Sequence, residues 1–181
     1  AEKVVDEFKR ILNIKVGETT PDGKFSINDV GCGYGALLAF LETRYRDLEY
    51  YGCDIVPAMV EAARREHKSR PNARFAVEAE PSRIADYGVA SGIFNVRLGR
   101  SDGEWRAYMN DMLEALAHTS RRGFAFNCLT RYSDPEKMRG DLYYADPADL
   151  FDLCKTRYSR HVALLHDYGL YEFTILVRMD A

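Results

Sequence analysis

The chain has 181 residues, 46% of them hydrophobic and 29% charged, which is enough for one hydrophobic core and too few for two comfortable domains. Its longest apolar runs fall far short of the roughly 20 residues of a membrane span, and no positively charged, then apolar leader is evident, so we expect a single cytoplasmic domain over residues 1–181. A net charge of −3, with acidic and basic residues interspersed, disfavours a nucleic-acid partner.

The four cysteines are scattered along the chain without a C-x-x-C pair and lie in mostly apolar segments. That spacing argues against a disulfide framework and against a zinc site, because structural zinc is usually held by Cys or His ligands at short spacing. We therefore expect no metal and four reduced core residues: Cys32, Cys53, Cys128 and Cys154.

The first third of the chain alternates between helical and extended patterns. Apolar residues at helical spacing predict a helix over residues 3–13, which together with a polar loop makes an N-terminal region over 1–20. A strand is predicted over 25–30, followed by a glycine-rich turn and a helix with its apolar residues on one face. A second strand is predicted over 48–55.

The same alternation continues along the rest of the chain. Strands are predicted over residues 73–79, 87–95 and 123–130, and helices over 57–70, 104–118 and 145–157. Asp146 is a suitable N-cap for the last of these helices, and Pro147 follows it at a position where its missing N–H costs nothing.

The end of the chain, HVALLHDYGLYEFTILVRM over residues 161–179, reads as two strands joined by a short turn. Strands with so short a connection must be antiparallel. The repeated strand–helix units before them predict a parallel sheet with helices on both faces. The expected fold is therefore α/β, a doubly wound seven-stranded sheet whose last strand is antiparallel.

The turn after the first strand reads DVGCGYG, residues 29–35. It falls where doubly wound sheets bind ligands, outside the carboxyl ends of the strands. Gly31, Gly33 and Ala36 satisfy the dinucleotide pattern G-x-G-x-x-G/A, and Asp54 lies near the distance expected for a carboxylate that binds a ribose. These residues alone would support an NAD-dependent oxidoreductase.

Asp29 favours a different ligand. A carboxylate this close to the turn would repel a pyrophosphate, whereas it would attract a positively charged sulfonium cofactor. The pattern acid-x-Gly-x-Gly-x-Gly, the acid in YGCDIVPAMVEAAR at the end of the second strand, and the closing hairpin together resemble the class I S-adenosylmethionine-dependent methyltransferases. The resemblance covers nearly the whole chain and implies the strand order 3-2-1-4-5-7-6.

The resemblance also implies a role for each residue of the motif. The backbone of the glycine turn would lie against the methionine part of S-adenosylmethionine, and Asp29 would support its ammonium group. Asp54 would accept the ribose hydroxyls, with Ile55 against the adenine. The residues of the turn in this role are Gly31, Cys32, Gly33 and Gly35.

Two further segments complete the implied cofactor site. An acid after the third strand would contact the adenine amino group, and we prefer Glu80 to Glu78 because VEAE parallels the family's VEGD. The residues after the fourth strand, Gly92 and Phe94 among them, would pass beneath the methyl donor.

The sequence carries fewer signals for the methyl acceptor than for the cofactor. There is no Asn-Pro-Pro-Tyr or Pro-Cys after the fourth strand, which favours a small-molecule substrate methylated on oxygen or nitrogen rather than on carbon. Asn95 and His166 are the candidate catalytic residues at the predicted rim, together with Asn127 and the Tyr143–Tyr144 segment. An unperturbed histidine, with a pKa of about 6.5, suits a general base.

Other interpretations of these residues stay open. The glycines could simply form a tight turn, Asp54 could cap a helix, and the tyrosines could pack on the core instead of forming a lid. His166 could be structural. At the level of function, the alternatives are an NAD-dependent oxidoreductase and a non-catalytic methyltransferase-like binding subunit. Asn28, in a central strand, needs a hydrogen-bond partner if it is buried.

Overall fold

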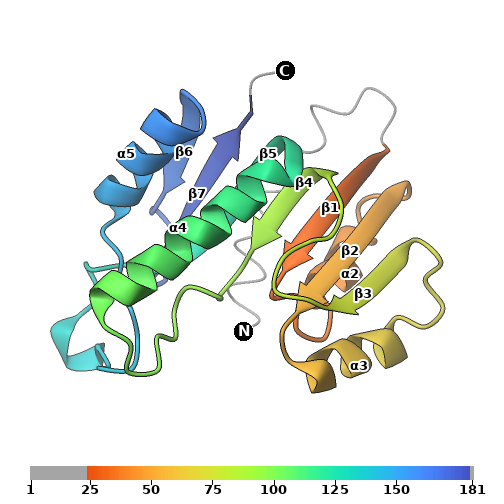
Figure 1. The fold of residues 1–181 in the computed structure, drawn as a ribbon, viewed down its shortest axis with the longest axis horizontal. Helices are drawn as coiled ribbons and strands as arrows, with labels where there is room; N and C mark the ends of the chain where they lie inside the picture. The colour runs from red at the N-terminus through yellow and green to blue at the C-terminus, as the bar shows by residue number, and fades with distance from the viewer. Residues whose placement is uncertain (1–23, 180–181) are drawn as a thin grey trace.

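The computed structural model describes residues 24–179 and contains one seven-stranded sheet in the order β3-β2-β1-β4-β5-β7-β6 (Figure 1). The strands are β1 (Phe25–Val30), β2 (Leu48–Asp54), β3 (Ala73–Val77), β4 (Ala85–Ala90), β5 (Ser120–Leu129), β6 (His161–Leu165) and β7 (Glu172–Arg178). Only β7 runs against the others, since it pairs antiparallel with both β5 and β6. The predicted order and the single antiparallel strand are confirmed. The helix predicted over 3–13 lies outside the described residues.

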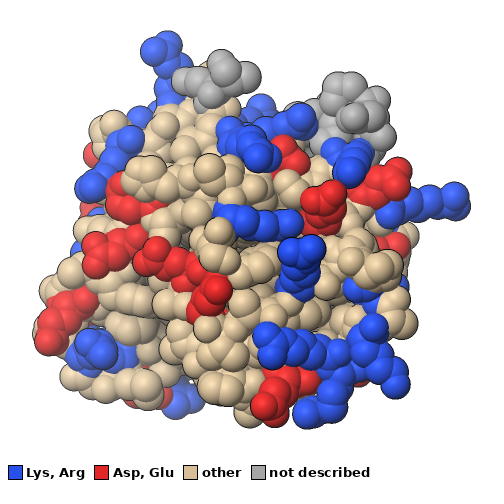
Figure 2. All heavy atoms as spheres, turned by 45° about the vertical axis from the view of Figure 1, so that its right-hand side comes forward, with Lys and Arg blue, Asp and Glu red and all other residues tan. Residues whose placement is uncertain are grey.

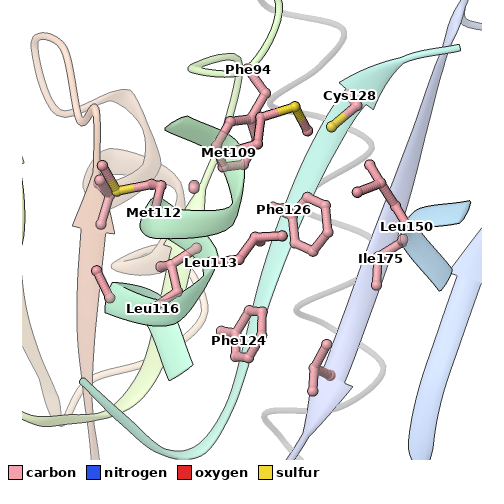
Figure 3. Close-up of a cluster of buried hydrophobic side chains, with 14 of the residues drawn as sticks. Phe94, Met109, Met112, Leu113, Leu116, Phe124, Phe126, Cys128, Leu150 and Ile175 are labelled. Carbon is pink, nitrogen blue, oxygen red and sulfur yellow. The ribbon is translucent and has the colours of Figure 1, made fainter. Parts of the chain in front are cut away.

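Four α-helices and a 3-10 turn connect the described strands: α2 (Ala36–Leu41), α3 (Pro57–Glu66), α4 (Asp102–His118), η1 (Pro135–Lys137) and α5 (Pro147–Arg157). Helices α4 and α5 cover one face of the sheet, where the side chains shown in Figure 3 pack from α4, α5, β5, β7 and the loop after β4. Helices α2 and α3 cover the other face, where Leu38 and Val60 join a second cluster around Ile27. Two apolar layers therefore enclose the sheet, as the alternating pattern predicts.

Both helices on the α4 side start at a side-chain cap. Ser101 and Glu104 form a capping box at the start of α4, which begins two residues earlier than predicted. The Asp146 side chain accepts a hydrogen bond from the Ala148 N–H at 2.9 Å, and Pro147 follows it as the first residue of α5. The predicted N-cap of α5 is confirmed.

Strand β4 is shorter than the predicted range 87–95. It ends at Ala90, so Gly92, Phe94 and Asn95 lie in the loop that follows it. The strand ends there because Gly92 has φ +78°, which breaks the extended conformation. The residues predicted to lie beneath the methyl donor are thus in a loop, which places them at the carboxyl edge of the sheet.

No helix lies between β3 and β4, and Arg83 in their connecting loop covers part of the sheet. Its guanidinium donates hydrogen bonds to Asn28 Oδ1 at 3.1 Å and to the Ile27 carbonyl at 3.1 Å, and it lies 5.4 Å from the centre of the Tyr51 ring. Asn28 in turn donates to the Arg83 carbonyl at 3.0 Å. It also donates to the Thr119 carbonyl at 3.3 Å, so the partners that a buried Asn28 requires are Arg83 and Thr119.

The surface carries mixed charge. On the face shown in Figure 2, acidic and basic side chains lie among one another instead of forming a single basic stripe. In residues 24–179 no helix has the length and apolar character needed to span a bilayer.

Candidate cofactor-binding site

A cavity of about 590 Å³ lies at the carboxyl ends of β1, β2 and β4, within the size range typical of small-molecule sites. Its wall comes from the end of β1, the end of β2, the loop after β3, the loop after β4 and one face of α4. Of the predicted cofactor residues, the cavity is lined by Gly31, Asp54, Ile55 and Gly92. The fold thus brings together segments up to about 80 residues apart in the chain, from Val30 to Met112.

The glycines of the turn are required for different reasons. Gly31, Gly33 and Gly35 all have positive φ, which favours glycine. A Cβ on Gly31 would lie 2.1 Å from Ile93 Cγ2, and one on Gly35 would lie 2.7 Å from His67 Nε2. A Cβ on Gly33 would meet nothing within 4 Å. A Cβ on Gly33 would therefore have open space around it, whereas protein side chains occupy the Cβ positions of the other two; of the three, Gly31 is the one that lines the cavity.

Asp54 holds the glycine turn in place and also faces the cavity. Its Oδ2 accepts the Gly33 N–H at 3.0 Å, and its Oδ1 accepts the Val56 N–H at 2.8 Å, at the start of α3. A carboxylate can accept about four hydrogen bonds, so both oxygens keep capacity for ligand hydroxyls. Val56 is the N-cap of α3 and no side chain caps that helix, so the helix-capping interpretation of Asp54 is wrong. Its carboxylate orders the turn before the helix and stays available to a ligand.

Asp29 lies behind the turn and does not line the cavity. It is 4% exposed and accepts a hydrogen bond from the Tyr50 hydroxyl. Burial raises the pKa of Asp29 to about 7; the bond from Tyr50 opposes the shift and the nearby Asp54 charge adds to it. A nearby cation would stabilise the ionised form of this carboxyl group.

Cys32 points into the core and away from the cavity. Its Sγ would lie 2.8 Å from a Cβ on Gly52, and its side chain belongs to the cluster under α2. Burial raises the pKa of its thiol, so it is a weak nucleophile. All four cysteines are buried and unpaired, as expected.

The residues predicted near the adenine are placed differently from one another. Ile55 is 71% exposed and lines the cavity. Glu78 and Ala79 also line it, and Glu78 accepts a hydrogen bond from the Tyr51 hydroxyl at 2.6 Å. Glu80 is exposed and is not among the lining residues. Of the two acids weighed for this role, Glu78 is the one at the cavity.

The loop after β4 divides between cavity and core. Ser91, Gly92 and Ile93 line the cavity. Phe94 is fully buried, with its ring against Phe126 at a centroid distance of 5.7 Å. Phe94 therefore supports the loop from below and does not face the cavity.

The Asn95 side chain is occupied within the protein. Its amide nitrogen donates to Glu172 Oε1 at 3.2 Å, and its Oδ1 accepts the Leu129 N–H at 3.1 Å. The Asn95 carbonyl accepts the Tyr143 N–H at 2.9 Å. This contact pins the Tyr143–Tyr144 segment onto the loop after β4.

His166 is exposed on the connection from β6 to β7. Its ring centroid lies 6.0 Å from that of Tyr132 and 6.0 Å from that of Phe173. Because β6 is an edge strand separated from β4 by β5 and β7, His166 is not among the residues that line the cavity.

Helix α4 contributes three lining residues that the sequence analysis missed: Trp105, Tyr108 and Met112. Their spacing of three and four residues puts them on one side of a helix, and this spacing was a usable signal. The Trp105 Nε1–H donates to the Phe94 carbonyl at 2.8 Å, so it also anchors the loop after β4. Within residues 24–179, no cluster of His, Cys, Asp and Glu could hold a metal ion.

Comparison with known proteins matches this architecture. A family model described as "Methyltransferase domain" matches residues 28–122. A protein of Mycobacterium tuberculosis (strain H37Rv), named "Putative methyltransferase Rv1506c", is 63% identical over 154 residues, which cover 85% of this chain and 93% of that protein.

Solved structures share the fold at low sequence identity. The magnesium protoporphyrin IX methyltransferase of Synechocystis PCC 6803 with bound SAH superposes with a TM-score of 0.72 at 17% identity, covering 98% of this chain and 83% of that one. Human N-acetylserotonin methyltransferase in complex with SAM superposes with a TM-score of 0.65 at 16% identity, covering 98% of this chain and 55% of that one. The chain belongs to the methyltransferase domain family, and its fold is that of the class I S-adenosylmethionine-dependent methyltransferases.

Proposed function

We propose that this protein is an S-adenosylmethionine-dependent methyltransferase that holds its cofactor in the cavity at the carboxyl ends of β1, β2 and β4. The observation that carries the proposal is the pairing of Asp54 with Gly33. The carboxylate lies at the cavity wall and is oriented by the N–H of a glycine whose own Cβ position is open. The fixed carboxylate can accept hydrogen bonds from the two hydroxyls of a sugar. The glycine without a side chain lets the rest of the ligand approach the main chain closely.

The shape and chemistry of the remaining wall fit the cofactor. Gly92 lines the cavity and a Cβ there would meet nothing within 4 Å, so the loop after β4 also lets a ligand approach the backbone. Ile55, Ile93 and Met112 supply apolar surface for an adenine ring. The Glu78 carboxylate stands beside that surface and can accept from an amino group.

Asp29 contributes charge and no direct contact with the cavity. Its ionised form favours a cation near the glycine turn and disfavours a pyrophosphate. This argues for S-adenosylmethionine over NAD, as does the antiparallel β7.

When bound, S-adenosylmethionine supplies an electrophilic methyl group on a sulfonium sulfur. The residues of this chain act on that reaction by positioning, which is the main requirement of an in-line displacement at carbon. With the cofactor bound, Asp54 would accept hydrogen bonds from its ribose hydroxyls, and the loop Ser91–Ile93 would form part of the wall around it. The apolar face of α4 would keep water from that wall.

We further propose a small-molecule acceptor, methylated on oxygen or nitrogen. The mixed surface charge supports this assignment, because a nucleic-acid substrate would favour a basic stripe. Of the two residues predicted to act on the acceptor, Asn95 has its amide occupied by Glu172 and Leu129. His166 stays a prediction as general base.

The test is calorimetry with S-adenosylhomocysteine on the wild type and on Asp54→Asn. The substitution removes a charged acceptor, so the Kd should rise about 10- to 100-fold. Asp111→Asn, at an exposed position on α4 outside the cavity, is the matched control and should leave the Kd unchanged. A wild type that binds NAD but neither S-adenosylmethionine nor its product would overturn the assignment.

The acceptor is tested separately. Incubating the wild type with methyl-labelled S-adenosylmethionine and pools of small alcohols, phenols and amines should label one class. Transfer to nucleic acid alone would contradict the small-molecule proposal. His166→Ala should lower turnover on the labelled class by roughly 10²–10⁴-fold if His166 is the base. Unchanged turnover would remove that role.

A further inference from the structure

A buried carboxylate lies next to the cavity loop without lining the cavity. Glu172 is the first residue of β7, pairs with Leu129 of β5 and is 9% exposed. No Lys or Arg of residues 24–179 forms an ion pair with it. Burying a carboxylate costs free energy unless hydrogen bonds compensate, so its partners indicate what it does.

Those partners are two asparagine amides on neighbouring segments. Asn127 Nδ2 donates to Glu172 Oε2 at 2.9 Å, and Asn95 Nδ2 donates to Oε1 at 3.2 Å. On their other sides, Asn127 Oδ1 accepts the Gly92 N–H at 2.7 Å and Asn95 Oδ1 accepts the Leu129 N–H at 3.1 Å.

The chemistry of Glu172 dictates the orientation of both amides. An ionised carboxylate only accepts hydrogen bonds, so each asparagine must turn its NH₂ toward Glu172. Each Oδ1 then points the opposite way, toward a backbone N–H that needs an acceptor. Glu172 thereby orients the Asn127 amide so that its Oδ1 accepts the Gly92 N–H.

We propose that Glu172 is a positioning residue, which fixes the loop Ser91–Asn95 and thereby the cavity wall formed by Ser91, Gly92 and Ile93. This inference rests on the proposed function, because that wall is where the cofactor is assigned. Glu172 touches neither the cofactor nor the acceptor in this assignment, and it acts through Asn127 and Asn95.

The first experiment is calorimetry with S-adenosylhomocysteine on the full chain carrying Glu172→Gln. The glutamine has one acceptor and one NH₂, so one asparagine must turn and a backbone N–H loses its partner. If that N–H is Gly92's, the loop loosens, and the Kd should rise about tenfold, the effect of one lost hydrogen bond. Every titration is made at a temperature at which circular dichroism shows the variant folded.

Thr174→Val is the matched control. Thr174 is buried on the same face of β7, two residues along, but its hydroxyl is bonded to the Tyr168 hydroxyl at 2.8 Å. Thr174 is the cross-strand neighbour of Asn127. Its substitution also removes a buried polar group from β7, while the hydrogen bonds of both asparagine side chains are made with other groups and stay in place. We expect lower thermal stability and an unchanged Kd. A Kd that changes as much in Thr174→Val as in Glu172→Gln would overturn the positioning role.

A rescue variant separates positioning from stability. In Glu172→Gln combined with Asn127→Asp, the new carboxylate accepts from both the Gly92 N–H and the glutamine NH₂. The glutamine oxygen then accepts from Asn95, so every hydrogen bond and the net charge are kept. The Kd should return to within about threefold of the wild type, whereas Asn127→Asp alone places two carboxylates together and should bind poorly.

Amide hydrogen exchange at Gly92 tests, without a ligand, whether Glu172 positions the loop after β4. The Gly92 N–H should exchange faster in Glu172→Gln than in the wild type and recover protection in the rescue variant. A Glu172→Gln protein that stays folded, binds within twofold of the wild type and keeps both the Gly92 and the Leu129 N–H protected would overturn the inference. Failure of the wild type to bind S-adenosylhomocysteine would overturn the proposed function, and exchange at Gly92 would still decide the role of Glu172.

Discussion

Asp29 is buried next to the glycine turn, and burial makes its charge sensitive to pH near neutrality. The pKa of its carboxyl group is raised from 3.8 to about 7 in the folded chain. Between these values the folded chain holds a proton that the unfolded chain has lost. The contribution of Asp29 to stability is therefore fully present below about pH 4 and is lost as the pH rises through about 7.

Asp29→Asn should remove that pH dependence. Asparagine can still accept from the Tyr50 hydroxyl but does not ionise. Relative to the wild type, the variant should gain stability as the pH rises from 4 to 7.5, by up to about 4 kcal/mol. Thermal unfolding followed by circular dichroism at several pH values measures the gain. Parallel stability curves for the two proteins would show that Asp29 ionises normally.

Gly33 should be the glycine of the turn whose substitution acts on the ligand and not on the core. Its φ of +55° disfavours a side chain, and a Cβ there would meet no protein atom within 4 Å. Gly33→Val should weaken S-adenosylhomocysteine binding more than about tenfold. Gly140→Ala, in a loop where a Cβ also meets nothing within 4 Å, is the control and should bind normally. Equal affinity in the two variants would show that the cofactor lies elsewhere.

Helix α4 carries a face of the cavity, so the stability of its first turn bears on the site. Ser101 and Glu104 share the capping box at this end, and Gly103 lies within the first turn with room for a Cβ. Ser101→Ala should cost about 1 kcal/mol of unfolding free energy. Gly103→Ala should add about 0.5–1 kcal/mol, because alanine loses less chain entropy. Urea denaturation measures both, and effects of the same sign would contradict the capping geometry.

The loop between β3 and β4 replaces a helix on one part of the sheet, and Arg83 holds it there. Arg83→Met keeps an apolar stem over Tyr51 but leaves the buried Asn28 Oδ1 without its donor. The expected loss is about 2 kcal/mol, the cost of one buried unpaired acceptor. Arg74→Met, at an exposed position on β3, should cost little. A loss below 0.5 kcal/mol for Arg83→Met would show that the loop does not stabilise the sheet.

For the whole molecule, a ligand that binds only the folded chain raises its melting temperature by mass action. At 100 times its Kd, S-adenosylhomocysteine should add about 2.7 kcal/mol, or roughly 5–10 °C for a chain of this size. NAD at the same concentration should add nothing. Thermal unfolding with each ligand measures the difference, and a shift with NAD alone would favour the oxidoreductase alternative.

The features that sequence determined are those set by neighbours in the chain. The short connection between β6 and β7 requires an antiparallel pair, and the alternation of strands and helices before it predicts the rest of the sheet. Asp146 and Pro147 mark the start of α5 through bonds within one helical turn. The acid and glycines of the first turn indicate the family from sequence alone. Like the start of α5, this turn is a local conformation that adjacent residues determine.

The site itself needed the tertiary structure. Glu80 and Phe94 lie next to cavity residues in the chain, yet one is exposed outside the cavity and the other is fully buried beneath it. Glu172 on β7 bonds to Asn95 in the loop after β4, 77 residues away in the chain, and to Asn127 on the intervening strand β5, 45 residues away. Which side chains face a cavity and which support it depends on the register and packing of segments distant in sequence. Local propensity carries no information about that packing, and only the assembled sheet decides it.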